Sequence, residues 1–272
     1  MKPDPFSLIP PVRRARGFRL YCVSGERLLD LHQDGGRAIL GRRPEGVSRE
    51  LKALASRGLS GDLPSVYGKR VVAALRRLLP GMSCFRLAAS PQRALWFASA
   101  LLGRRVEEED AADPAFAAPG TTGREISLWR PFLPPAFEPD ADVLIPVLPF
   151  GAACAPAAVC FRRELPKDFP PSDTLSPLLL AACARALYNL GDRPSPPWME
   201  GAADARLWDR RGPYLAALCG EEEYGERWRA GLAHGILLNP RRSGPSILPA
   251  EASEGELAAM RKVLGARWRN DG

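Results

Sequence analysis

The chain has 272 residues, 46% of them hydrophobic, which is enough to bury a core as one large domain or two closely packed ones. It contains no stretch of about 18 uncharged apolar residues and no charged-then-apolar pattern at its N-terminus, so we expect neither a membrane-spanning helix nor a signal peptide. The formal net charge is +7, but basic and acidic residues are interleaved along the chain. The sequence therefore does not predict a nucleic-acid partner.

The cysteines and histidines do not form a metal-binding pattern. Six cysteines are scattered among mostly apolar neighbours without a Cys-x-x-Cys pair, and there are two histidines. Four ligands for zinc would need cysteines at ligand spacing, so no metal site is predicted. The cysteines are expected to be reduced, buried thiols in a cytoplasmic protein.

Four helices are predicted from their caps and stops. Serine before proline is typical of a helix start, Ser-x-x-Glu forms a capping box, and glycine commonly ends a helix. The predicted helices are Ser65–Leu79, Ser90–Gly103, Ser176–Gly191 and Ser253 to about Trp268.

Short apolar runs between these helices predict strands. Two of them flank a Ser-Gly-Glu turn and predict a hairpin, and alternation of strands with helices indicates an α/β protein. The predicted strands are Phe18–Val23, Arg27–Leu31, Cys84–Ala88, Ile126–Trp129, Asp142–Val147, Ala158–Phe161 and Gly235–Leu238.

The segment from Gly17 to Gly58 carries a resemblance to a known family. It reads GFRLYCVSGERLLDLHQDGGRAILGRRPEGVSRELKALASRG, and the later stretches FRLAASPQRALWFASALLGR, FEPDADVLIPVLPFGAACAPAAVCF and GLAHGILLNPRRSGPSILPAEASEGELAAM follow in the order of the family's motifs. Together they resemble class-III aminotransferases that use pyridoxal phosphate (PLP), and most closely the glutamate-1-semialdehyde aminomutase branch. The match covers about residues 17–103 and 138–265.

This resemblance implies a reduced PLP-dependent transferase fold of fold type I, with a large-domain remnant and a C-terminal α+β small domain. The predicted segments are an N-terminal hairpin and helix at 1–60, the reduced large domain at 61–169 and the small domain at 170–272. The family runs to over 400 residues, and the shortfall falls between Gly103 and Glu138. The family's ring-stacking aromatic and pyridine-binding aspartate have no counterpart in that interval.

Two departures from the family bear on chemistry. The lysine that holds PLP as a Schiff base is indispensable there, and its position is Leu148 here. The family's Ser-Gly-Thr turn binds the cofactor phosphate on backbone N–H groups, and here it reads Ser90-Pro91-Gln92. Proline removes one donor, so Ser90 and Gln92 are the remaining candidates for an anion. The family glutamate after this turn is Arg93.

The resemblance together with these losses predicts a non-catalytic homologue that acts as a binding or regulatory subunit. No cofactor is expected, although the family resemblance leaves PLP binding open. The family's dimers imply a homodimer or a heteromer with an intact aminotransferase-like chain. The alternative is a PLP-dependent aminotransferase or aminomutase that uses a relocated lysine or a partner chain. The candidate lysines are Lys52, Lys69, Lys167 and Lys262.

Two further groups of residues are candidates for binding a small ligand. His32 follows the predicted hairpin in Leu-His-Gln-Asp-Gly-Gly, where a ligand contact or a hydrogen-bonded structural role both fit. Arginines near loops bind carboxylate or phosphate, or remain as solvated surface charges. They are Arg37, Arg42, Arg43, Arg124 and Arg130.

Overall fold

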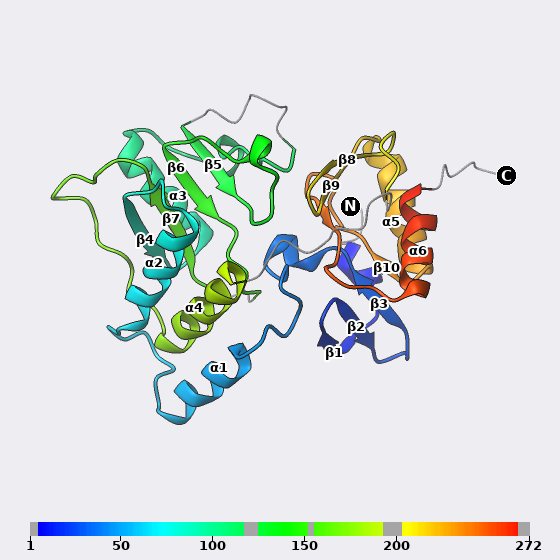
Figure 1. Cartoon of the computed structure of the whole chain (residues 1–272), viewed down its shortest axis with the longest axis horizontal. Helices are drawn as coiled ribbons and strands as arrows, with labels where there is room; N and C mark the ends of the chain where they lie inside the picture. The colour runs from blue at the N-terminus through cyan, green and yellow to red at the C-terminus, as the bar shows by residue number, and fades with distance from the viewer. Residues whose placement is uncertain (1–4, 117–124, 152–154, 193–202, 266–272) are drawn as a thin grey trace. The chain divides into compact units, whose positions relative to one another are not determined.

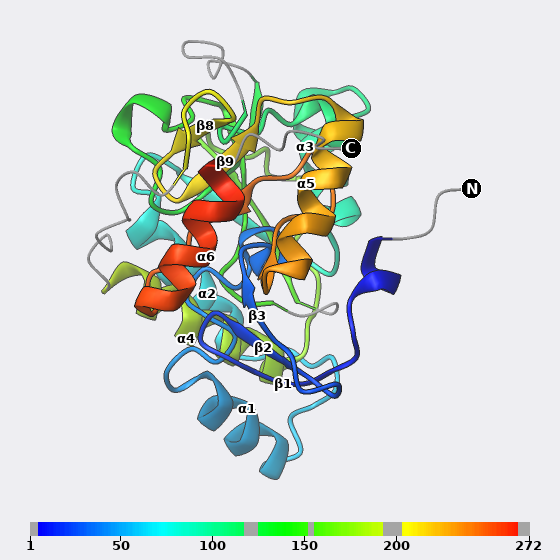
Figure 2. The ribbon, with the colours of Figure 1, turned by 90° about the vertical axis from the view of Figure 1, so that its right-hand side faces the viewer.

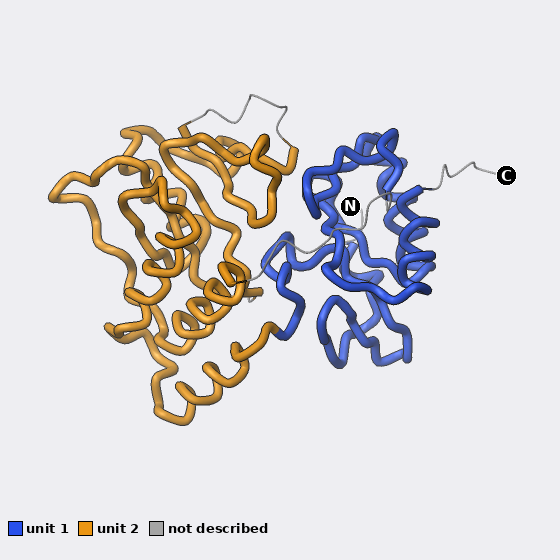
Figure 3. Tube along the Cα trace, viewed as in Figure 1, with its two compact units in different colours: residues 1–43, 196–272 blue, residues 44–195 orange. Residues whose placement is uncertain are grey.

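The computed structural model describes residues 5–116, 125–151, 155–192 and 203–265. The chain forms two compact units, of which unit 1 comprises residues 1–43 and 196–272 and unit 2 comprises residues 44–195 (Figure 3). The sequence predicts three consecutive segments instead. The observed units differ from the predicted segments because the N-terminal hairpin packs with the C-terminal part of the chain, while residues 170–192 pack with the segments before them.

Unit 1 is built on a four-stranded sheet of order β1-β2-β3-β10, in which a three-stranded antiparallel meander is extended by one parallel strand. The meander is the predicted hairpin with one more strand before it. Its strands are β1 (Val12–Arg16), β2 (Arg19–Cys22), β3 (Arg27–Asp30) and β10 (Ile236–Leu237).

A second sheet and two helices complete unit 1. The sheet has the order β11-β9-β8, and α5 and α6 lie side by side against β10 (Figures 1 and 2). Leu20 and Cys22 of β2 and the consecutive Leu28 and Leu29 of β3 join a core that contains Trp208, Tyr224 and Trp228. The elements are β8 (Trp208–Arg211), β9 (Tyr214–Ala217), α5 (Glu221–Ala233), β11 (Ser246–Ile247) and α6 (Glu254–Gly265). Short 3-10 turns are formed by Pro5–Leu8 and Gln33–Gly36.

Unit 2 contains a four-stranded mixed sheet of order β4-β7-β6-β5. Only β5 and β6 are parallel, and α3 packs on β4 and β7. The strands are β4 (Cys84–Ala88), β5 (Ile126–Trp129), β6 (Val143–Pro146) and β7 (Ala157–Phe161).

The helices of unit 2 are grouped around α4, which is buried on most of its surface and packs against α1 and α2. This packing explains why its sequence is apolar almost all round. The helices are α1 (Val47–Ser56), α2 (Tyr67–Leu78), α3 (Pro91–Leu102) and α4 (Pro177–Gly191), with 3-10 turns at Glu108–Asp110 and Pro135–Phe137.

Two of the four predicted helix caps form and two do not. Ser90 caps α3 as predicted, and Ser253 and Glu256 form the predicted capping box of α6. Ser176 precedes α4, but its hydroxyl donates to the carbonyl of Ser60. The Ser65 prediction is wrong, because Val66 is the residue before α2 and the Ser65 hydroxyl is buried without a partner.

The described cysteines are free thiols that differ in exposure. Cys22, Cys160 and Cys183 are buried, and burial raises the pKa of each thiol, to about 12 for Cys183. Cys84 in unit 2 and Cys219 in unit 1 are partly exposed. Cys154 lies outside the described residues.

Candidate functional site

The turn between β4 and α3 is the predicted anion site, and Ser90 occupies its centre. Ser90 has an extended backbone, with φ of −155° and ψ of 164°, and its hydroxyl accepts a hydrogen bond from the backbone N–H of Arg93 at 3.1 Å. Pro91 follows as the first helical residue, where its fixed φ suits the helix and its missing N–H costs nothing. Local sequence alone therefore sets this end of α3.

The carboxylate of Asp173 lies at the same turn. It accepts a hydrogen bond from the backbone N–H of Ala89 at 3.0 Å and another from Nε of Arg93 at 3.0 Å. Its own backbone N–H donates to the carbonyl of Leu87, and Ser172 accepts from the N–H of Leu87, so the 172–173 segment is fixed along β4. The protein thus supplies its own anion at the place where the family resemblance implies a phosphate.

Arg93 is held on two sides. Its guanidinium carbon lies 3.9 Å from the ring centroid of Trp96 and 4.7 Å from that of Phe97, while Nε pairs with Asp173. Cation–π contact and a charge-assisted hydrogen bond together favour one position of the side chain. Arg93 stands at the position matched to the family glutamate, and here it pairs with Asp173.

These contacts decide how well the turn fits a cofactor phosphate. Pro91 has no N–H, and the N–H groups of Ala89 and Arg93 already donate to Asp173 and Ser90. The backbone N–H groups of Ser90 and Gln92 make no hydrogen bond among the described residues. Two N–H groups beside the fixed carboxylate of Asp173 do not replace the several donors that hold a phosphate at a helix N-terminus, so the residues present do not fit this group.

Leu148 follows β6 and is buried, with 4% of its surface exposed. The backbone around it is fixed, because the N–H of Val147 donates to the carbonyl of Trp129 and the N–H of Phe150 to the carbonyl of Leu148. An isobutyl side chain can contribute packing here but neither a nucleophile nor a base. Its correspondence to the family lysine stays a prediction from the sequence.

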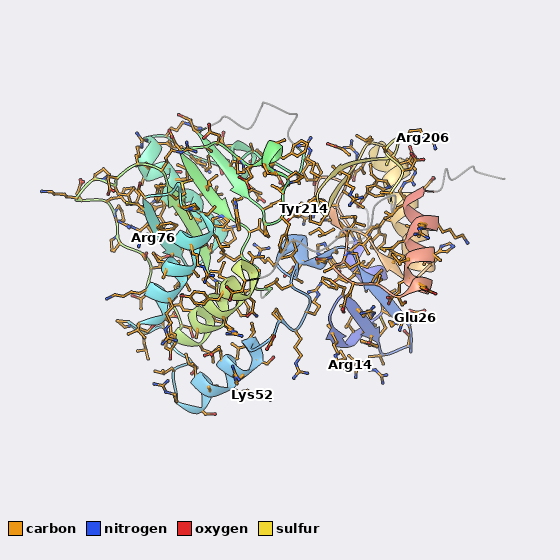
Figure 4. The ribbon with its side chains drawn as sticks, viewed as in Figure 1. Arg14, Glu26, Lys52, Arg76, Arg206 and Tyr214 are labelled. Carbon is orange, nitrogen blue, oxygen red and sulfur yellow. The ribbon has the colours of Figure 1, made fainter. Side chains whose placement is uncertain are left out.

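The candidate lysines within the described residues are all exposed. Figure 4 shows Lys52 on α1. Lys69 differs from the others because it lines a cleft of about 550 Å³ in unit 2, between α2 and the 172–175 segment. The exposed lysines are Lys52, Lys69, Lys167 and Lys262.

His32 lies in a strained turn of unit 1. The next two residues, Gln33 and Asp34, have positive φ values of 44° and 52°, which non-glycine residues seldom adopt. Burial lowers the pKa of His32, although Asp30 and Asp34 act in the opposite direction. Its Nδ1 and the Oε1 of Gln33 are both buried without a hydrogen-bond partner. A neutral imidazole with an open nitrogen can accept a hydrogen bond, which leaves both predicted roles open.

The predicted arginine group does not form one cluster. Arg42 forms an ion pair with buried Asp30 at 2.7 Å, and Arg130 makes a bidentate pair with Asp113, with both distances 2.7 Å. These two arginines stabilise the fold of their own units. Arg43 is exposed in unit 1, and Arg124 lies outside the described residues.

One residue of interest, Asp173, was not predicted from the sequence. Asp173 sits in Pro-Pro-Ser-Asp-Thr, a segment without a local signal for this contact, and its partners are about 80 residues away. Among the described residues no group of three or more histidine, cysteine and acidic side chains is arranged to hold a metal ion. No helix of the described part is long and apolar enough to cross a membrane.

Comparison with known proteins places the fold. An ornithine aminotransferase from Plasmodium falciparum superposes with a TM-score of 0.67 at 11% identity, over 97% of this chain and 93% of that chain. An omega-transaminase from Sphaerobacter thermophilus gives 0.64 at 12% identity, over 94% and 91%. The chain has the fold of the class-III PLP-dependent aminotransferases. The fold predicted from the sequence motifs is thereby confirmed.

The sequence comparisons add a relative but no activity. No family model matches the chain. An uncharacterized protein of Treponema pallidum is 29% identical over 289 aligned positions, covering 88% of each chain. Function must therefore be argued from the residues of this aminotransferase fold.

Proposed function

We propose that this chain is a non-catalytic homologue of the class-III aminotransferases. The observation that carries the proposal is the buried leucine, Leu148, that follows β6 at the position matched to the Schiff-base lysine. PLP supplies its chemistry only through a covalent bond to an amine that is positioned for exchange. A buried leucine at this position can contribute packing, but it has no amine with which to form that bond.

The α3 turn supports the same proposal. Asp173 and Ser90 take up the N–H groups of Ala89 and Arg93, and Arg93 is committed to Asp173 and its aromatic neighbours. A phosphate here would have to displace a carboxylate that is fixed by its own backbone. Electrostatic repulsion between Asp173 and an incoming phosphate adds to this cost.

One alternative has a specific observation behind it. Lys69 lines the unit 2 cleft, together with Asp173 and several apolar side chains. If PLP chemistry persists with a relocated lysine, Lys69 is the candidate, because the other candidate lysines line neither this cleft nor the described cleft of unit 1. Its exposed side chain argues against this role, since a catalytic lysine needs a desolvated or cation-flanked place to lower its pKa.

The proposed role is that of a binding or regulatory subunit in the cytoplasm. A chain with an aminotransferase fold and an abandoned site can still pair as the family does. The proposed assembly is a homodimer or a heteromer with an intact aminotransferase-like chain.

The test is incubation of the purified full chain with PLP, followed by visible absorbance, borohydride reduction and mass mapping of lysine adducts. We expect no discrete absorbance band and only sparse labelling of exposed lysines. Lys69→Arg is compared with Lys52→Arg, which removes an amine from an exposed helix outside the cleft. A stoichiometric adduct that is lost with Lys69→Arg and retained with Lys52→Arg would overturn the proposal in favour of the enzyme.

A further inference from the structure

The meander of β1, β2 and β3 in unit 1 presents several arginines on one face of its sheet. In the antiparallel register Arg14 pairs with Tyr21, Tyr21 pairs with Arg27, and Arg16 pairs with Arg19. Directly paired residues project from the same face of a sheet, so these five side chains share it. Leu20, Cys22 and Leu28 alternate with them and are buried on the other face. Figure 4 labels Arg14 on this hairpin.

This face forms one wall of a cleft of about 860 Å³ within unit 1, and the start of α6 forms another. The volume is in the range of small-molecule sites. Four arginines and two glutamates line the cleft, which leaves an excess of two positive charges. The arginines are Arg16, Arg19, Arg27 and Arg43.

The two glutamates do not neutralise the cleft evenly. Glu256 accepts two hydrogen bonds from Arg19 at 2.7 Å each and also the hydrogen bonds of Ser253 in the capping box. Glu251 lies 3.4 Å from Arg19 as well. Arg16 and Arg43 have no carboxylate within ion-pair distance among the described residues. Arg16 also lies directly opposite Arg19 on the neighbouring strand, where two like charges repel each other.

A close backbone contact brings Arg43 to this face. Gly41 has a φ of +85°, and a Cβ added to it would lie 3.2 Å from Cα and O of Gly17. The N–H of Arg42 then donates to the carbonyl of Gly17 at 2.7 Å. Arg43 therefore follows directly after a segment that is fixed against Gly17. Because Gly17 is the residue after Arg16, Arg43 is brought close to this face although it is far from Arg16 in the sequence.

We propose that this cleft binds a phosphorylated small molecule, with Arg16 and Arg43 contacting the phosphate and Tyr21 the organic part. A phosphate monoester carries about −1.5 to −2 charges at neutral pH, which matches the excess of two positive charges better than a single carboxylate does. Arginine pairs bidentately with phosphate oxygens. This site is independent of the proposed loss of PLP chemistry.

The test is isothermal titration of the full chain with inorganic pyrophosphate at low ionic strength. We expect saturable binding to one site, and a loss of roughly tenfold in affinity for each of Arg16→Gln and Arg43→Gln. The single substitutions Arg13→Gln and Arg49→Gln are the charge-matched control, because each removes one exposed positive charge and neither residue lines the cleft.

A second measurement locates the ligand without any substitution. Hydrogen exchange of the wild-type chain with pyrophosphate is expected to slow in residues 14–27, 41–43 and 251–257 and to stay unchanged in unit 2. Failure of wild-type binding to saturate would overturn the proposal. An equal loss of affinity in the charge-matched control, or protection outside these segments, would overturn it as well, since both indicate a general charge effect.

Discussion

Replacing Glu256 by glutamine removes the charge that joins α6 to β2. The carboxylate is bound by two nitrogens of Arg19 and by the N–H and hydroxyl of Ser253. The hydrogen bonds from Arg19 come first among the causes that lower its pKa from 4.5 to about 2. At about 1.4 kcal/mol per pKa unit this shift corresponds to ~3 kcal/mol. Because the Arg19 side chain is 20% exposed, water screens the pair, and a loss of about 1–2 kcal/mol is expected.

The sign of the pH dependence follows from the direction of the shift. A carboxyl group whose pKa is lowered by folding stabilises the folded state above its unfolded pKa, and this contribution is lost as the pH falls through the folded pKa. The difference between wild type and Glu256→Gln should therefore be complete above pH 6, shrink below the unfolded pKa of 4.5 and be nearly gone at about 2.

Urea denaturation from pH 7 down to pH 3 measures this difference, and hydrogen exchange of β2 and α6 peptides assigns it to unit 1. Glu251→Gln is the control, because the Glu251 side chain is 66% exposed and its pairing should contribute less than ~0.5 kcal/mol. A difference that stays constant between pH 7 and pH 3 would refute the reasoning, and so would an equal loss for the two substitutions.

Two other predictions concern unit 2. Leu148→Lys is expected to lower the free energy of unfolding by at least ~3 kcal/mol at pH 7, because burial lowers the pKa of the new amine. This loss should diminish as the pH rises toward about 10. Leu148→Met should lower the free energy of unfolding by less than ~1.5 kcal/mol in the same urea titrations. Ser90→Ala should cost about 1 kcal/mol and speed exchange of the Arg93 amide, whereas Ser65→Ala should be neutral or slightly stabilising because it removes a buried hydroxyl without a partner. An exchange rate at Arg93 unaffected by Ser90→Ala would contradict the cap.

Elements with strong local signals could be predicted from the sequence. Cys84–Ala88 and Ile126–Trp129 form strands over the predicted residues, and the Ser90-Pro91 cap is set by neighbours in the chain. Trp208–Arg211 was missed as a strand because its charged residues conceal the pattern: Arg211 is buried and paired with Asp209. The acidic first turn of Glu221–Ala233 was a usable signal for a helix that the sequence analysis did not predict.

The parts that could not be predicted depend on contacts between distant segments. The parallel pairing of Leu29 with Ile236 joins the N-terminal hairpin to the C-terminal part of the chain, and no local pattern specifies it. Asp173 reaches the α3 turn in the same way. The family resemblance indicated where an anion site would be, but the carboxylate that occupies the turn comes from a distant segment with no local signal for this contact.

The uneven exposure of the thiols gives the chain a built-in pair of labelling positions. Cys22, Cys160 and Cys183 are buried, with raised pKa values that keep them as unreactive thiols, whereas Cys84 in unit 2 and Cys219 in unit 1 are partly accessible. After replacement of Cys154 by serine, maleimide dyes should couple to one position in each unit. Energy transfer between the two dyes would then report how the units move when a ligand or partner chain is added, with the buried cysteines left in place.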